Sequence, residues 1–333
     1  MFEKHRPQLF QIANEPLTPA GHLAAHEYIY PPEVMRLVQK PGAEIARAKQ
    51  INPDLQSEAA TIYDLIETSS EEMFRLDCAA RSGNQDTAGW RMARDQERIK
   101  KIFIINLSKH GTYIDPWKND AYANFPWAAW MDRVGADQAA LLACQLALQR
   151  TRQVDQAFST TRFINTRTLL LAAKHTPEEM HDMIRRSRIH LIYSGKKNEY
   201  EPIKRALHNQ RALIPHETVT IRHNKRNFNT YNQLEDLAQY FTQPKVRRQL
   251  TDAMIIFVLY APQAVRAMRM YAHLKNSFPQ VPVAVAPLPT SNNAIPEYPM
   301  NEVRGIVYYF LANQTVSYPP PYHILPLPQW QIV

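Results

Sequence analysis

The strongest constraint on the fold lies between Ile189 and Ala267, where short apolar runs alternate with segments of helical pattern. The runs at 189–193, 218–221 and 253–260 have the length and the apolar, often β-branched content of buried strands. A chain that alternates strands and helices in this way predicts an α/β fold in three layers, with a mostly parallel sheet between two layers of helices. Ligands of such sheets bind beyond the carboxyl ends of the strands.

Polar residues follow the predicted strands at the points where the strands end. Ser194-Gly195 follows the first strand, and Asn229-Thr230 opens the helix predicted at 231–241. A hydroxyl and a tight turn near a helix start attract anions, because backbone N–H groups are free there. We therefore expect a ligand site at this edge, although Ser194-Gly195 also fits a plain turn and Asn229 a helix cap. The expected ligand-binding residues are Ser108, Ser194, Gly195, Lys196, Glu201, Asn229, Thr230, Gln263 and Arg266.

Two charged residues in this set have alternative roles. Arg266 lies one turn into the helix after the strand at 253–260, where a guanidinium suits bidentate recognition of an anion. Arg269 nearby indicates instead that this helix has a solvated basic face. Glu201 fits either a contact to a ribose hydroxyl or a carboxylate that stabilises the positive end of its helix.

The rest of the chain predicts additional parts around this region. The predicted organisation is a helical or irregular N-terminal extension at 1–100, a Rossmann-like α/β domain at 101–315 and a Pro-rich C-terminal arm at 316–333. Within the extension, Ser69-Ser70 predicts a helix start. The apolar run at 102–107 predicts the first strand of the domain, and it ends at Ser108.

Composition restricts the kinds of function. The formal charge of +8 suits an anionic ligand, although it also fits a mildly basic protein. Only eight glycines occur and none is arranged as Gly-x-Gly, which excludes a Walker A loop and the usual dinucleotide fingerprint. Two cysteines are too few for a disulfide framework or a cysteine-based zinc site, and we expect no metal. No apolar run reaches the ~18 residues that span a membrane, and Met1–Phe10 lacks the apolar core of a secretion signal. We therefore expect a cytoplasmic protein.

Two further clusters of residues fit either a structural or a functional role. The basic run Arg222–Arg226 can contact phosphate, but a solvated loop also explains it, and we do not expect nucleic acid as a partner. The aromatic segment Trp117–Trp130 fits either a binding loop beyond a strand end or a hydrophobic cap.

The central stretch resembles the bacterial SanA/YdcF/ElyC-like family, a domain of unknown function. The resemblance covers Ile189–Pro289 and rests on Tyr193-Ser194-Gly195, Glu201, Asn229-Thr230 and the segment Tyr260–Ala267. It implies a Rossmann-like fold and, as in some members, binding of S-adenosylmethionine. Other members are linked to cell-envelope and lipid-carrier metabolism.

The chain differs from the family pattern at two positions, and two hypotheses of its function remain. Gln263 stands where the family has a histidine, and an amide cannot shuttle a proton. Lys196 stands where another glycine often follows Ser-Gly. The leading interpretation is a protein that binds a small anionic or nucleotide-like ligand, S-adenosylmethionine or a phosphorylated metabolite, at the strand carboxyl ends, with no reaction assigned. The alternative is a non-catalytic interaction protein or effector, with a protein partner, on a degenerate version of this scaffold.

Overall fold

The computed structural model describes residues 59–108, 126–151, 175–195, 214–223, 229–289, 298–319 and 321–327. Within these ranges the chain forms two compact units made of interleaved segments. The helical unit contains the mutually packed helices α5 (Ala59–Ser82), α14 (Ala261–His273) and α15 (Tyr298–Leu311). The sheet unit contains the strands and the helices α6 (Ala88–Arg94), α8 (Pro126–Arg150), α10 (Pro177–Arg186), α12 (Thr230–Thr242) and α13 (Pro244–Arg247).

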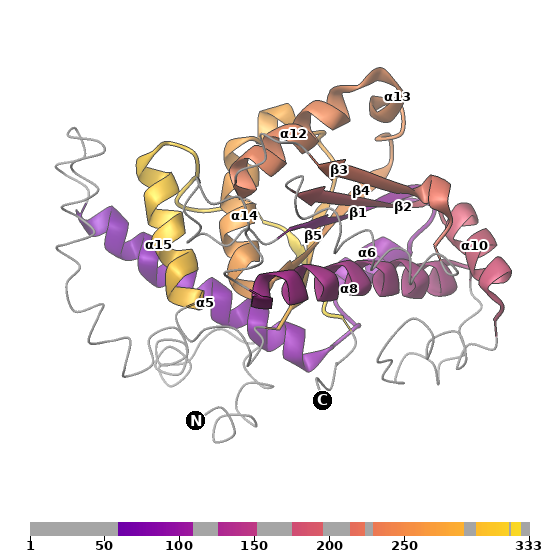
Figure 1. Ribbon diagram of the computed structural model, residues 1–333, viewed down its shortest axis with the longest axis horizontal. Helices are drawn as coiled ribbons and strands as arrows, with labels where there is room; N and C mark the ends of the chain where they lie inside the picture. The colour runs from indigo at the N-terminus through magenta and orange to yellow at the C-terminus, as the bar shows by residue number, and fades with distance from the viewer. Residues whose placement is uncertain are drawn as a thin grey trace. The chain divides into compact units, whose positions relative to one another are not determined.

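The described strands form a parallel sheet in the order β3-β2-β1-β4-β5-β6 (Figure 1). Their bounds are β1 Lys101–Leu107, β2 Ile189–Gly195, β3 Val219–His223, β4 Ala253–Tyr260, β5 Val283–Leu288 and β6 His323–Ile324; two 3₁₀ turns lie at η3 His216–Thr218 and η4 Lys275–Ser277. The sheet confirms the predicted α/β, Rossmann-like fold, and it is parallel throughout rather than mostly parallel. The Pro-rich C-terminal segment supplies an unpredicted strand, since β6 pairs with β5 through Ala284 and His323.

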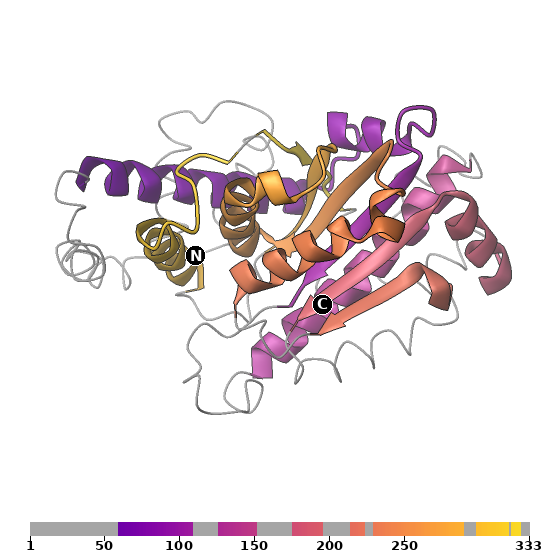
Figure 2. The same cartoon turned by 90° about the horizontal axis from the view of Figure 1, so that it is seen from above.

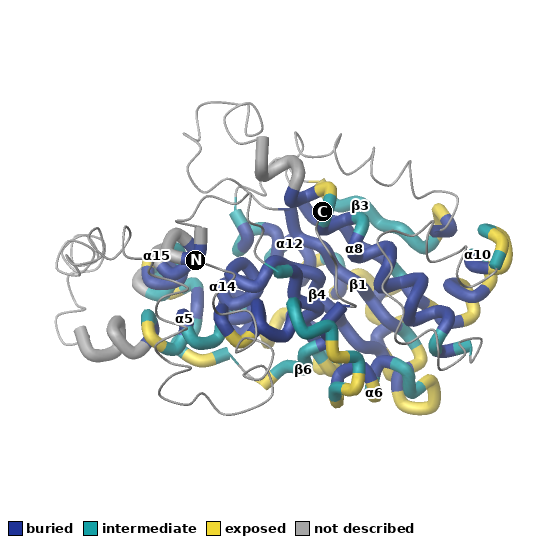
Figure 3. The backbone as a smooth tube through the Cα atoms, turned by 90° about the horizontal axis from the view of Figure 1, so that it is seen from below, coloured by how far each residue is buried: buried dark blue, intermediate teal, exposed yellow. Residues whose placement is uncertain are grey.

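The core of the sheet unit follows from the composition of its central strands. All eight residues of β4 are buried, as are six of the seven in β1 (Figure 3). A parallel sheet is covered on both faces, so its central strands need apolar side chains at every position rather than at alternate ones. These two strands also pair directly, with Ile104 opposite Ile256.

Helices cover both faces of the sheet. The chain passes through α8 and α10 between β1 and β2, and through α12 between β3 and β4. Figures 1 and 2 show α8 and α12 on opposite faces, as right-handed crossovers require. On the α8 face the Tyr193 hydroxyl donates to the Ala136 carbonyl at 3.1 Å. On the α12 face the rings of Phe103 and Phe241 meet edge to face, 5.4 Å apart.

Two helix starts show how well the sequence predicts helix boundaries. The Thr176 side chain caps α10 and Pro177 follows at its first position, with Glu179 completing a reciprocal capping box. The helix start predicted at Ser69-Ser70 is wrong, because both serines lie inside α5. There the Ser70 hydroxyl donates to the Ile66 carbonyl at 2.7 Å, within the helix. None of the helices in the described ranges is both long and apolar enough to span a membrane.

Candidate functional site

The topology singles out the carboxyl ends of β1 and β4. From β1 the chain adds β2 and β3 on one side, and from β4 it adds β5 and β6 on the other. The strand order therefore reverses between β1 and β4, and ligands of open α/β sheets bind at such a switch point.

Asn106, the next-to-last residue of β1, is the buried polar side chain at this switch point. Its amide nitrogen donates to the Val258 carbonyl of β4 at 3.0 Å. Its Oδ1 atom has no hydrogen-bond partner among the described residues. Gly135 of α8 lies directly against it, since a Cβ atom there would be 2.7 Å from the Asn106 Nδ2. The predicted set omitted Asn106, although a lone amide in an otherwise apolar strand was a usable signal.

Ser108 and Ser194, both predicted, meet at the ends of β1 and β2. The Ser108 backbone N–H donates to the Ser194 carbonyl at 2.8 Å, and both side chains are fully buried. Gln233, from the sheet-facing side of α12, donates through Nε2 to the Ser108 hydroxyl at 2.9 Å. The Ser194 hydroxyl has no hydrogen-bond partner in the described part of the chain. Gln233 was also missed, and its signal is an amide on the apolar face of a predicted helix.

An arginine extends this polar row to β3. Arg222 is paired in register with Ser194, and its guanidinium binds Asp236 of α12 through two hydrogen bonds of 2.6 and 2.7 Å. The guanidinium carbon also lies 4.9 Å from the centre of the Tyr240 ring. The interpretation of Arg222 as part of a solvated loop is therefore wrong, because it is a largely buried strand residue whose charge Asp236 balances.

The remaining predicted residues of the sheet unit have clear positions. Gly195 closes β2 and is buried. The Asn229 side chain accepts from the Asn232 backbone N–H at 2.9 Å, which confirms its role as the cap of α12. Thr230 is the first residue of that helix and is buried. Lys196 and Glu201 lie outside the described residues.

Gln263 and Arg266 belong to α14 in the helical unit, where both are buried. The Arg266 Nε lies 2.6 Å from a carboxylate oxygen of Glu302, and its guanidinium carbon is 6.0 Å from the centre of the Tyr309 ring. The solvated basic face expected around Arg269 is wrong, since that side chain is buried and ion-paired with Glu72. Arg266 thus already has a carboxylate partner inside its own unit.

Comparisons with protein-family models, curated proteins and solved structures found no match for this chain. The resemblance to the SanA/YdcF/ElyC-like family therefore stays a prediction. Among the described residues, no group of three His, Cys, Asp or Glu side chains is arranged to hold a metal ion. The candidate site in the sheet unit consists of neutral hydrogen-bonding side chains near the start of α12, with the ion-paired Arg222 at one end.

Proposed function

We propose that this protein binds a small anionic or nucleotide-like ligand, of the S-adenosylmethionine or phosphorylated-metabolite class, at the carboxyl ends of β1 and β2. The observation that carries the proposal is the Ser194 hydroxyl, which is fully buried and has no partner among the described residues. A buried polar group without a hydrogen bond costs roughly 1–3 kcal/mol. A ligand that donates to or accepts from this hydroxyl would offset that cost.

The types of polar group favour a ligand with a nucleoside-like portion. Asn106 offers an amide oxygen and Ser194 a hydroxyl, both neutral. Neutral donors and acceptors in a buried setting suit sugar hydroxyls and base edges, which need hydrogen bonds rather than charge. The positive end of α12, capped by Asn229 beside the same strand ends, suits the anionic portion of such a ligand. Lys196 follows Gly195 directly in the sequence and adds a positive charge.

Titration calorimetry on the full chain tests this proposal. The panel is S-adenosylmethionine, S-adenosylhomocysteine, AMP and ATP, against wild type, Ser194→Ala and Ser187→Ala. Ser187 is the matched control, because its hydroxyl is also buried without a partner in the described residues, but it ends α10 rather than β2. We expect Ser194→Ala to weaken binding about tenfold, the loss of one hydrogen bond of ~1.4 kcal/mol, and Ser187→Ala to bind like wild type.

Two outcomes would contradict the proposed site. The first is equal affinity of wild type and Ser194→Ala for every ligand that binds. The second is that no member of the panel binds the wild-type protein.

A further inference from the structure

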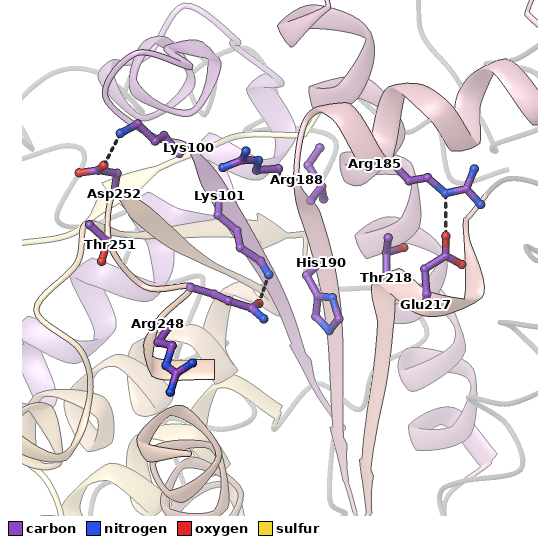
Figure 4. Close-up of a pocket in the computed structure, with 12 residues that line it drawn as sticks. Lys100, Lys101, Arg185, Arg188, His190, Glu217, Thr218, Arg248, Thr251 and Asp252 are labelled. Atoms are coloured by element: carbon purple, nitrogen blue, oxygen red, sulfur yellow. Dashed lines mark hydrogen bonds and ion pairs between the residues drawn. The ribbon is translucent and has the colours of Figure 1, made fainter. Parts of the chain in front are cut away.

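A cavity lies at the opposite, amino-terminal edge of the sheet (Figure 4). Its volume is about 580 Å³, and its walls come from the starts of β1 and β2, the end of α10, η3 and the segment between α13 and β4. Its basic lining residues are Lys100, Lys101, Arg185, Arg188, His190 and Arg248. The ligand site predicted for a parallel sheet is at the other edge, so neither the fold nor the resemblance assigns this cavity.

Charge in the cavity is unbalanced. Two carboxylates line it, and each already binds one cation: Glu217 lies 2.6 Å from Arg185, and Asp252 lies 2.8 Å from Lys100. The other three cations have no carboxylate partner among the described residues, and they are Lys101, Arg188 and Arg248. Figure 4 shows all of these side chains around one hollow rather than along an extended stripe.

The unbalanced cations and the histidine act on one another. Burial, and then the charge of Arg188, lower the pKa of Lys101. Burial, and then the charge of Lys101, lower the pKa of His190 to about 4, so His190 is neutral near pH 7. The His190 ring is held by a 2.8 Å hydrogen bond between Nε2 and the Thr220 hydroxyl. An anion in the cavity would relieve this accumulation of positive charge.

The backbone at Arg188 adds an independent observation. Arg188 immediately precedes β2 and has a φ of 51°, in the left-handed region that costs residues with a Cβ atom roughly 1–2 kcal/mol. Glycine or asparagine would occupy this turn with less strain. Many helices end in a left-handed residue directly after the C-cap, as Arg188 follows Ser187 at the end of α10, but that residue is usually glycine or asparagine. An arginine at this position therefore places a cation at the cavity at a cost in backbone strain.

We propose that this cavity binds a small molecule with two or more negative charges, of the phosphorylated or polyphosphate class. The volume falls within the ~300–1,000 Å³ usual for small-molecule sites. Arg188 and Arg248 supply guanidinium groups, which bind phosphate oxygens in pairs, and Lys101 supplies an ammonium group that donates a hydrogen bond to Gln249. This site is separate from the one at the carboxyl ends, and it stands whether or not that proposal holds.

Titration of the full chain with inorganic tripolyphosphate tests the cavity. The test variants are Arg188→Asn, which tolerates the left-handed backbone, and Arg248→Gln. Arg98→Gln is the control, because Arg98 is exposed, does not line the cavity and changes the net charge equally. We expect each test variant to weaken binding about tenfold, as for the loss of one charge-assisted contact, while Arg98→Gln binds like wild type.

Three results would overturn the proposal. One is equal binding of tripolyphosphate by wild type and both test variants. Another is a loss in Arg98→Gln as large as in Arg188→Asn, which would indicate only net charge. The third is tight binding of an RNA oligonucleotide that tripolyphosphate does not displace, because the cavity would then be part of a nucleic-acid surface.

A second experiment uses only the wild-type protein, so its result does not depend on whether a variant folds. Wild-type protein is acetylated with an amine-specific reagent, with and without tripolyphosphate, and each lysine is followed by mass spectrometry. We expect tripolyphosphate to slow modification of Lys101 several-fold and to leave Lys245, an exposed residue of α13, unaffected. Equal slowing of both lysines, or of neither, contradicts binding in the cavity.

Discussion

At the carboxyl edge of the sheet, two side-chain oxygens without a hydrogen-bond partner among the described residues, Asn106 Oδ1 and Ser194 Oγ, are neutral and buried. At the amino edge the side chains without a carboxylate partner in the described part of the chain include Arg188 and Arg248, which are cationic and exposed. A neutral group can be buried at a cost of a few kcal/mol, whereas an unpaired charge must stay in contact with water. Removing the partner of a charge should therefore lower the free energy of unfolding at the carboxyl edge much more than at the amino edge.

The largest expected contrast comes from the same substitution at the two edges. Asp236→Asn leaves the largely buried Arg222 without its carboxylate, and we expect the free energy of unfolding to fall by about 3 kcal/mol. Asp252→Asn at the amino edge removes the partner of the exposed Lys100, and we expect a loss below about 1 kcal/mol. Asparagine also tolerates the φ of 56° at position 252, so the backbone adds no further effect. Urea unfolding of both variants measures the difference.

Equal losses in these two variants would contradict the expected difference in stability between the two edges. A loss of stability in Asp252→Asn alone would reverse the expected order, and would show that the ion pair at the amino edge contributes more to stability than the one at the carboxyl edge.

The next effect depends on pH and tests His190 at the amino edge. Burial and the charge of Lys101 lower its pKa from 6.5 to about 4 in the folded protein. Between these values the unfolded chain binds a proton that the folded chain does not, so stability falls as pH falls from about 6.5 to 4 and then levels off. We expect a loss of roughly 2 kcal/mol, allowing for the partial exposure of the ring.

Urea unfolding at several pH values measures this slope, with His190→Gln as the variant. Glutamine keeps a side chain able to bond Thr220 but does not titrate, so the part of the slope due to His190 should disappear. His216→Gln, at an exposed position, should keep the slope. An unchanged slope in His190→Gln would show that His190 is not the group responsible.

A smaller effect concerns close packing at the carboxyl edge. Glycine-to-alanine changes inside helices usually stabilise by up to about 1 kcal/mol. At Gly135 the new Cβ would lie 2.7 Å from the Asn106 Nδ2, so we expect destabilisation by about 1–2 kcal/mol instead. At Gly305 of α15 the nearest atom is the Arg266 Cδ at 3.4 Å, and we expect the usual gain. Thermal unfolding of the two variants should therefore shift the midpoint in opposite directions, and a gain in both would show that Asn106 moves freely.

The fold can be predicted from the sequence because neighbouring residues determine most of its strands and helices. The eight apolar residues of β4 and the Thr176-Pro177 start of α10 each specify one element from neighbouring residues alone. The parallel order then follows from the alternation of strands and helices. The C-terminal strand β6 was missed because two residues between prolines have no pattern of their own, and pairing with β5 defines them.

The candidate sites depend on contacts between distant residues, and the sequence predicts them less well. Ser108 and Ser194 were found because each directly follows an apolar run in the sequence, but the charge of Arg266 is balanced by Glu302, 36 residues away. The amino-edge cavity was missed entirely, because its charged residues come from four separate segments of the chain. The left-handed backbone of Arg188 likewise has no signature, since arginine there replaces the glycine or asparagine that would signal a turn.

The smallest expected effect separates a structural role of Ser194 from a ligand-binding one. Its hydroxyl has no partner in the described residues, so Ser194→Ala removes no hydrogen bond seen there and relieves the burial of a polar group. We expect the free energy of unfolding without ligand to rise rather than fall, by up to about 1 kcal/mol, the low end of the cost of a buried polar group without a hydrogen bond, and the same for Ser187→Ala. Urea unfolding of both variants with and without a ligand from the panel completes the test. A loss above about 1 kcal/mol in Ser194→Ala without ligand would mean that the hydroxyl has a structural partner, and the carboxyl-edge proposal would lose its main support.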